Sequence, residues 1–253
     1  MKSPYNSNYF RESIFENDYS AMAELIAKHY KPGKILEIGC GQGQLSKALA
    51  KSGAQIIAID GFSEPDFGDY PNISFYQVDL NDIEKTHQFI DGLEDHFDLT
   101  ISMEVAEHLD PKVNKHLVDW LTKKTDHVVF SAGVTGQGGE GHINCQDRDF
   151  WYRLITEQGF HLNGFLRSEF RENHGIRPWY KLNALDFSRK KSVEDPKLIF
   201  DLIKADSYAS SMYFQTQIET ERLRAILNIP SIKLVFNVRN WLKRLIGSPP
   251  IKL

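Results

Sequence analysis

Short apolar runs alternate with amphipathic stretches along most of the chain, and this alternation predicts its secondary structure. Strands are expected at 34–38, 54–60, 73–79, 97–104 and 127–132, where apolar residues follow one another closely. Helical spacing of apolar positions is found between them, at 14–30, 44–50, 111–124 and 147–157. Because strands that alternate with helices pair in parallel, the pattern predicts an α/β fold.

The pattern changes towards the C-terminus. Residues 161–170 and 181–187 are interpreted as a terminal pair of strands, which completes a seven-stranded sheet that is mostly parallel with one antiparallel strand. Residues 192–224 are expected to form two helices. We therefore expect a doubly wound, Rossmann-like domain in residues 1–190 and a C-terminal helical extension in residues 191–253.

A glycine-rich turn lies where the first strand gives way to a helix. Residues 37–43 read Glu-Ile-Gly-Cys-Gly-Gln-Gly, and their glycines permit a sharp turn and a close approach of the backbone to a ligand. A dinucleotide fingerprint would require a third glycine at position 44, which is Gln44. The chain has two cysteines, which form no disulfide framework, and Cys40 fills a place in the turn that needs a small side chain.

Acidic residues recur where the predicted strands end. Asp60 follows the second strand, Asp79 follows the third, and Glu37 lies near the end of the first. In open α/β sheets a ligand binds beyond the carboxyl ends of the strands, so these acids are expected to face one site. An acid at the end of the second strand can accept hydrogen bonds from both ribose hydroxyls of a nucleoside.

The E-x-G-x-G-x-G turn, the acids at 60 and 79 and the E-x-x-E-H element at 104–108 together resemble class I S-adenosylmethionine-dependent methyltransferases. The resemblance spans roughly residues 30–135 and implies S-adenosylmethionine as cofactor. It assigns the ribose to Asp60 and the adenine amine to Asp79. The residues that it implies for cofactor binding are Glu37, Gly39, Cys40, Gly41, Gly43, Asp60, Gly61, Asp79, Leu80, Met103 and Glu104.

Residues 133–144 form a glycine-rich loop after the fifth strand, and this loop carries His142. Methyl transfer to oxygen requires alignment of the acceptor and removal of its proton, so a general base or a metal ion is needed. His142 is the first candidate and His108 the second. The loop resembles one in methyltransferases encoded near glycan-modification genes, which implies a hydroxyl acceptor on a small molecule or a glycan. Aromatic residues at 150–152 and 178–180, followed by Asn183, extend this likeness.

A metal site is a second interpretation of the same region. Glu104, Glu107 and His108 are spaced so that a helical turn would place them on one face. In quinone-pathway and small-RNA O-methyltransferases the corresponding residues bind a divalent ion. The resemblance thus implies Mg²⁺ or a similar ion here, with His142 as a fourth ligand. The alternative is that the turn only packs and caps a helix, while the ring nitrogens of His142 order the loop.

Charge limits the acceptors that we expect. The net charge is −4, with 25% charged and 41% hydrophobic residues, so nucleic acid is not attracted in general and an RNA substrate is disfavoured. No apolar stretch follows the first two residues, which argues against a signal peptide and favours a cytoplasmic protein. The spacing of residues in the sequence does not predict the identity of the acceptor.

The segment 232–246 is basic and amphipathic. Its Trp and Leu residues gather on one side, and residues 231–253 contain Lys and Arg but no acid. Such a helix either lies on a membrane surface, which would make the protein peripheral to the membrane and suit a lipid-associated substrate, or docks on the domain or another subunit. The oligomeric state is left open.

Two other classes of function are weighed against the methyltransferase. A nicotinamide-dependent oxidoreductase would need the glycine that is missing at position 44. A non-catalytic S-adenosylmethionine-binding partner subunit would share the fold and the cofactor site. The loop with His142 argues for an active enzyme.

Overall fold

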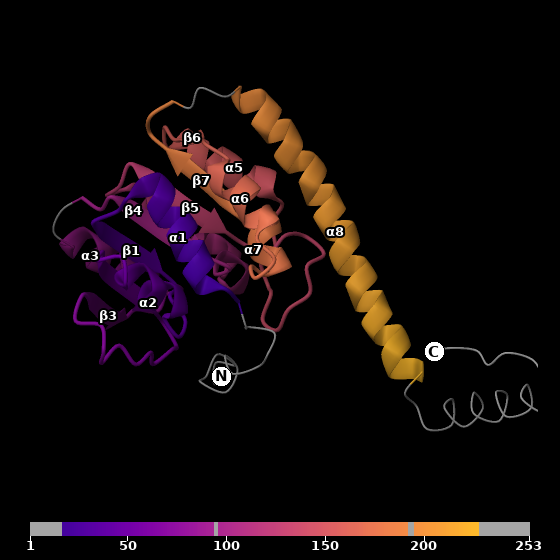
Figure 1. Cartoon of the computed structure of the whole chain (residues 1–253), viewed down its shortest axis with the longest axis horizontal. Helices are drawn as coiled ribbons and strands as arrows, with labels where there is room; N and C mark the ends of the chain where they lie inside the picture. The colour runs from indigo at the N-terminus through magenta and orange to yellow at the C-terminus, as the bar shows by residue number, and fades with distance from the viewer. Residues whose placement is uncertain (1–16, 94–95, 192–194, 228–253) are drawn as a thin grey trace, which may run out of the picture.

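The structure is a computed structural model that describes residues 17–93, 96–191 and 195–227. These residues form a mixed sheet covered by helices on both faces, with one long helix running along a flank of the domain (Figure 1). The predicted α/β class is confirmed.

Seven strands form one sheet in the order β3-β2-β1-β4-β5-β7-β6. Strand β7 is antiparallel to both of its neighbours, and the other pairings are parallel. The Rossmann-like sheet with one antiparallel strand is therefore as predicted. The strands are β1 (Lys34–Ile38), β2 (Gln55–Asp60), β3 (Ile73–Gln77), β4 (Leu99–Met103), β5 (His127–Ser131), β6 (His161–Leu162) and β7 (Leu185–Ser188).

The central strands are buried on both faces, which is why they read as continuous apolar runs. Leu36 and Ile38 of β1 pack into one core, with Trp120 and Trp151 among its fully buried members. Ile35 of the same strand packs into a second core on the opposite face. Because successive side chains of a strand point to opposite faces, this one short strand contributes apolar side chains to the cores on both sides of the sheet.

The helices that cover the sheet begin and end at recognisable signals. In α1, the Asp18 side chain accepts a hydrogen bond from the Ala21 N–H at the start, and Lys31 closes the end in a left-handed conformation. The helices are α1 (Tyr19–Tyr30), α2 (Gln44–Ala50), α3 (Ile83–Gly92), α4 (Asn114–Thr122), α5 (Arg148–Glu157), α6 (Phe165–Glu172), α7 (Pro178–Asn183) and α8 (Pro196–Leu227), with the 3₁₀ turns η3 (Ala106–His108) and η4 (Pro111–Val113).

The predicted strand pair at 161–170 and 181–187 is wrong in its extent. Only His161–Leu162 is extended in the first segment, because Gly164 adopts a φ of 78° and starts α6 immediately afterwards. In the second segment α7 continues to Asn183, and β7 begins at Leu185. Two short helices therefore occupy positions that the apolar pattern suggested for strands.

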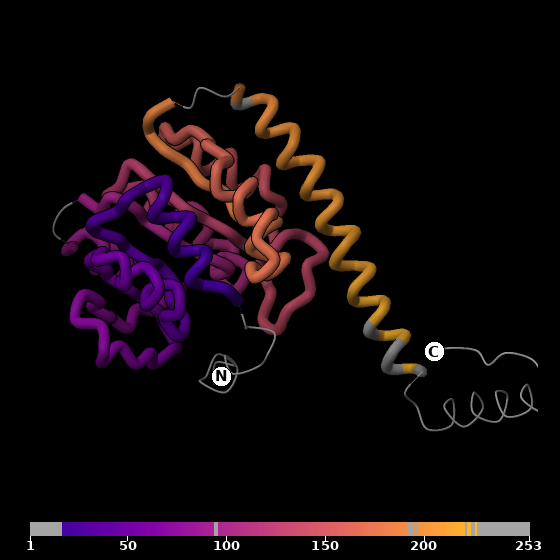
Figure 2. Tube along the Cα trace, viewed as in Figure 1, coloured from indigo at the N-terminus to yellow at the C-terminus, as the bar shows by residue number. Residues whose placement is uncertain are grey.

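The two helices predicted within 192–224 are one helix. Helix α8 has 32 residues, and no glycine or proline follows Pro196 within it. Figure 2 shows its trace without a break. Its apolar residues occupy two opposite faces, which obscured a single helical period in the sequence.

Two predictions lie outside the described residues. They concern the basic segment 232–246 and the first residues of the helix expected at 14–30. Among the residues that the structure describes, no helix is both long and apolar enough to cross a membrane.

Candidate active site

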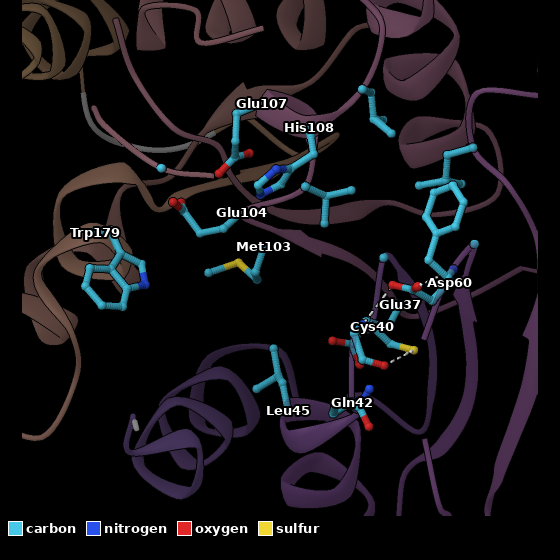
Figure 3. Close-up of a pocket in the computed structure, with 18 of the residues that line it drawn as sticks. Glu37, Cys40, Gln42, Leu45, Asp60, Met103, Glu104, Glu107, His108 and Trp179 are labelled. Carbon is cyan, nitrogen blue, oxygen red and sulfur yellow. Dashed lines mark hydrogen bonds between the residues drawn. The ribbon is translucent and has the colours of Figure 1, made fainter. Parts of the chain in front are cut away.

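A cavity of about 360 Å³ opens at the carboxyl ends of the central strands. Its wall contains the glycine turn after β1, the acids after β2 and β3, and the E-x-x-E-H element after β4. In Figure 3, Glu37, Cys40 and Asp60 lie towards one end, and Glu104, Glu107 and His108 towards the other. The sheet has therefore brought the two groups of predicted site residues to one cavity.

The glycine turn has the backbone shape that its sequence predicts. Gly39 and Gly43 have φ values of 81° and 73°, which L-residues rarely adopt. A Cβ on Gly43 would lie 2.3 Å from the ring of Phe67, and one on Gly39 would lie 2.4 Å from a methyl of Val105. Both glycines are therefore required by conformation and by space.

Glu37 supports this turn from within the domain. Its side chain is buried and accepts a hydrogen bond from the Ser46 hydroxyl at the start of α2. Burial raises the pKa of the Glu37 carboxyl to about 8, although the hydrogen bond from Ser46 acts in the opposite direction. The residue thus links β1 to α2 in the wall of the cavity.

Asp60 at the end of β2 accepts three backbone hydrogen bonds. The N–H of Gly41 donates to one oxygen at 2.9 Å, and those of Phe62 and Ser63 donate to the other at 2.9 Å each. The carboxylate thus fixes the glycine turn to the next strand while it lines the cavity.

Asp79 and Gly61 meet beside this carboxylate. A Cβ on Gly61 would come within 3.0 Å of the Asp79 Cα, so this glycine permits the close approach of the two loops. The Asp79 side chain accepts a hydrogen bond from the Asn81 N–H at 2.9 Å. Leu80 and Met103 add apolar surface to the same cavity.

Glu104 begins the opposite end of the cavity in an unusual conformation. Its φ is 54°, and its N–H donates to the carbonyl and hydroxyl oxygens of Ser131. Its carboxylate accepts hydrogen bonds from Gln137 Nε2 at 3.1 Å and from Asn183 Nδ2 at 3.1 and 3.2 Å. Amide groups from two distant segments therefore orient this side chain.

A second carboxylate and two imidazoles gather next to it. Glu107, His108 and His142 offer ligand atoms that all lie within 4.8 Å of one another. Glu107 is fully buried, and neither of its oxygens has a hydrogen-bond partner. Burial and the neighbouring Glu104 raise the pKa of Glu107 well above its usual value, against the weaker effect of nearby backbone N–H groups.

The comparisons agree with this geometry. Residues 9–132 match a family model described as a methyltransferase domain. These residues, just under half of the chain, are thus similar to methyltransferase domains, in agreement with the fold and the cavity described above. S-adenosylmethionine is accordingly the cofactor, and Asp60 and Asp79 line the cavity that would receive it.

Curated relatives and a solved structure of similar fold are named as methyltransferases. The ubiquinone biosynthesis O-methyltransferase of Proteus mirabilis is 26% identical over 63% of this chain and 61% of its own length. The enzyme of that name from Erwinia tasmaniensis is 30% identical over 60% of this chain and 59% of its own length. This chain thus spans about three fifths of each. A TehB-like methyltransferase structure from Corynebacterium glutamicum is 20% identical, covers 72% of this chain and 95% of its own, and has a TM-score of 0.47.

The two histidines of this methyltransferase domain are held as neutral rings. Burial, with a contribution from His142, lowers the pKa of His108 to about 4, and burial also lowers the pKa of His142. The rings meet edge to face with centroids 4.8 Å apart. His142 Nδ1 lies 3.3 Å from the Gln137 carbonyl oxygen, a distance that favours a proton on Nδ1 and an unprotonated Nε2. Both roles foreseen for His142, base and ligand, need this state.

Behind the site of the methyltransferase lies a layer that the sequence did not reveal. Arg148 is almost completely buried and donates a 2.7 Å hydrogen bond to the side-chain amide oxygen (Oδ1) of Asn183. It also donates to Ser207 and Ser210 of α8. Arg148 thus orients the Asn183 amide, whose NH₂ group holds Glu104. The sequence shows only an arginine at the start of a predicted amphipathic helix, and its burial is visible in the structure alone.

Proposed function

We propose that the protein transfers the methyl group of S-adenosylmethionine to a hydroxyl of a small molecule or glycan, assisted by a divalent cation. The observation that carries this proposal is the unpaired, fully buried carboxylate of Glu107 beside the two imidazoles. A buried carboxylate without a donor is costly unless a cation or a proton neutralises it.

The residues present fit a metal ion. Glu107, His108 and His142 would hold it, and one carboxylate with two neutral imidazoles is a donor set that Mn²⁺, Zn²⁺ or a similar ion accepts. Glu104 stands beside them, but its carboxylate is held by Gln137 and Asn183. It therefore fits a role in positioning or in contact with the acceptor. A bound ion would lower the pKa of an acceptor hydroxyl at this place.

The remaining chemistry is performed by the chain itself. The glycine turn and Asp60 bind and orient the cofactor, so that its methyl group lies towards Met103 and Glu104. The aromatic rings of Trp179 and Tyr180 line the acceptor end and exclude water. His142 Nε2 is the group that would take the acceptor proton where no metal ion supports it.

The curated relatives bring one class of acceptor into consideration. Both are named as ubiquinone biosynthesis O-methyltransferases, so an aromatic hydroxyl is the first acceptor to test, and an ortho-diphenol is a probe that one ion can bind through two oxygens. A sugar diol is the corresponding probe for a glycan. Both present two adjacent hydroxyl groups, a shape suited to a single ion.

The proposal is tested first by metal binding. Titration with Mn²⁺, followed by electron paramagnetic resonance, should show one bound ion in the wild type and none in Glu107→Gln. The matched control is His174→Ala, an exposed histidine outside the cluster, which should bind like the wild type. Equal binding by Glu107→Gln would remove the metal from the proposal.

Methyl transfer is the second readout. Labelled S-adenosylmethionine is offered with catechol or with a nucleotide sugar, in the presence of Mn²⁺ or of a chelator. Transfer that stops with the chelator supports the metal-assisted reaction. Transfer that continues unchanged, but is lost in His142→Ala, would assign the proton to the histidine alone.

A further inference from the structure

The outer face of α8 carries an apolar stripe that nothing covers in the described part of the chain. Leu198, Leu202, Met212, Leu223 and Ile226 are between 48% and 60% exposed. The opposite face of the helix is buried over its first half, where Ile199, Ile203 and Ser210 pack onto the domain. Figure 1 shows α8 along the flank of the domain. Because Ile199 and Ile203 face the domain, the exposed stripe lies on the side of α8 that faces away from it.

The stripe follows the spacing of a helix that pairs with another helix. Steps of four and three residues alternate from its first position to its last. The positions are Leu198, Leu202, Ala205, Ala209, Met212, Thr216, Glu219, Leu223 and Ile226, and every one of them is exposed. A helix packed only against its own domain needs apolar residues on one side alone, so the second stripe is unexplained by the fold.

We propose that this stripe binds the same stripe of a second copy of the chain, with the two α8 helices antiparallel. In the register that the spacing permits, Leu198 packs against the partner's Leu223, and Ala209 against the partner's Met212. The two-fold axis then passes near residues 210 and 211.

Charge supports this register. Asp201 borders the stripe near its start, and Arg222 borders it on the same side near its end. An antiparallel two-fold axis at residues 210 and 211 places Asp201 opposite the partner's Arg222, and the symmetry makes this ion pair twice. A parallel pair would place like charges at the same level, which is unfavourable.

Length argues for a second copy over other occupants. Helix α8 has 32 residues and is about 48 Å long, and its stripe extends over nearly all of that length. The segment 232–246 is about half as long and would leave one half of the stripe uncovered. A membrane surface is also unsuited, because it would bring the carboxylates of Asp201 and Glu219 against lipid. In the antiparallel pair Glu219 lies opposite the partner's Leu202 and retains its ion pair with Arg222 of its own helix, 3.9 Å away.

Pairing would also bear on the active site. On its inner face α8 contacts the glycine-rich loop, where Ser211 donates a hydrogen bond to the Thr135 carbonyl and Ile218 packs against Gly138. That loop carries His142. A partner that holds α8 in place would therefore restrain the loop at the acceptor end of the cavity.

The first experiment measures the mass of the full chain by sedimentation at micromolar concentrations. The wild type should be a dimer, and Leu223→Glu should raise the dissociation constant at least about a hundredfold, because it introduces two buried charges per dimer. The control Gln217→Glu, exposed on the same helix but outside the stripe, should remain a dimer. A wild type that stays monomeric overturns the proposal.

Charge reversal tests the register. Asp201→Arg and Arg222→Asp should each weaken the dimer by about tenfold, and the double variant should restore it. All of these side chains are exposed, so circular dichroism should show an unchanged fold. Failure of the double variant to recover would contradict the proposed ion pairs.

Cross-linking tests the direction. In the antiparallel register two copies of residue 212 lie about 5 Å apart along the axis, and two copies of residue 202 about 25 Å apart. A short bismaleimide should therefore link Met212→Cys to itself and leave Leu202→Cys unlinked, relative to the wild-type background from Cys40 and Cys145. Linking of both variants would indicate a parallel pair and overturn the antiparallel arrangement.

Discussion

The two ends of the cavity treat their carboxylates in opposite ways. At the cofactor end, Asp60 accepts three backbone hydrogen bonds and Asp79 accepts one, so each charge has partners within its own loop. At the acceptor end, Glu107 is buried without any hydrogen bond to its oxygens, beside a second carboxylate. The first end is organised in advance for neutral hydrogen-bonding groups, whereas the second holds a carboxyl that a cation or a proton must neutralise.

The largest effect is expected from breaking the organised end. Asp60→Ala leaves three backbone N–H groups without their acceptor and removes the acid expected to hold the ribose, so S-adenosylmethionine affinity should fall about a thousandfold. Titration calorimetry measures this. The control Asp66→Ala removes an exposed acid that lies in the loop after the same strand, and it should bind normally. Normal binding by Asp60→Ala would place the ribose elsewhere.

The second experiment replaces the buried carboxyl at the acceptor end with a neutral amide. Glu107→Gln should lower methyl transfer at least about a hundredfold and leave cofactor affinity within about twofold. In metal-free protein it should change the free energy of unfolding by less than about 1 kcal/mol, because the raised pKa already keeps the buried Glu107 carboxyl protonated and the amide has nearly the same shape. Kinetics and urea denaturation measure the two effects, with Glu157→Gln as an exposed control. Loss of both stability and activity would mean that Glu107 is structural.

Asp186 sharpens the comparison, since it is buried like Glu107 but accepts a 2.7 Å hydrogen bond from the Tyr30 hydroxyl. Burial raises the pKa of its carboxyl to about 6. A carboxyl whose pKa is raised on folding stabilises the folded state fully at pH values below its pKa in the unfolded chain. This stabilisation is lost as the pH rises through its pKa in the folded state, which is about 6 for Asp186.

Asp186→Asn should therefore change the pH dependence of stability. Between pH 4.5 and 7.5 the variant should gain about 2 kcal/mol relative to the wild type, since the wild type loses its contribution over this range. Urea denaturation at the two pH values gives the difference. A constant difference between the proteins at both pH values would show that Asp186 does not titrate in this window.

The smallest effect is expected one layer behind the site. Asn183→Leu removes the amide that holds Glu104, so methyl transfer should fall about tenfold while cofactor affinity stays the same. Steady-state kinetics should place the loss in kcat. The control Asn173→Leu alters an asparagine that lies outside the cavity wall. A change confined to cofactor binding would contradict the role given to Asn183.

Sequence alone determined the cofactor end of the molecule. The glycine turn, Asp60 and Asp79 each lie at the end of one strand, and parallel strands must bring these ends to one edge of the sheet. Local spacing was therefore enough to predict the sheet, the cavity edge and the family. The E-x-x-E-H element was also visible, although its helical face was replaced by a 3₁₀ turn after Glu104.

Only the tertiary structure decided the acceptor end. The fold of the glycine-rich loop places His142 beside Glu107. The amide of Asn183 reaches Glu104 from α7, a helix in a segment that the sequence pattern assigned to a strand. The two apolar faces of α8 were also hidden in the sequence. Two apolar stripes on one helix give no single helical period. Local periodicity reports which residues share a face, but not which distant segment that face will meet.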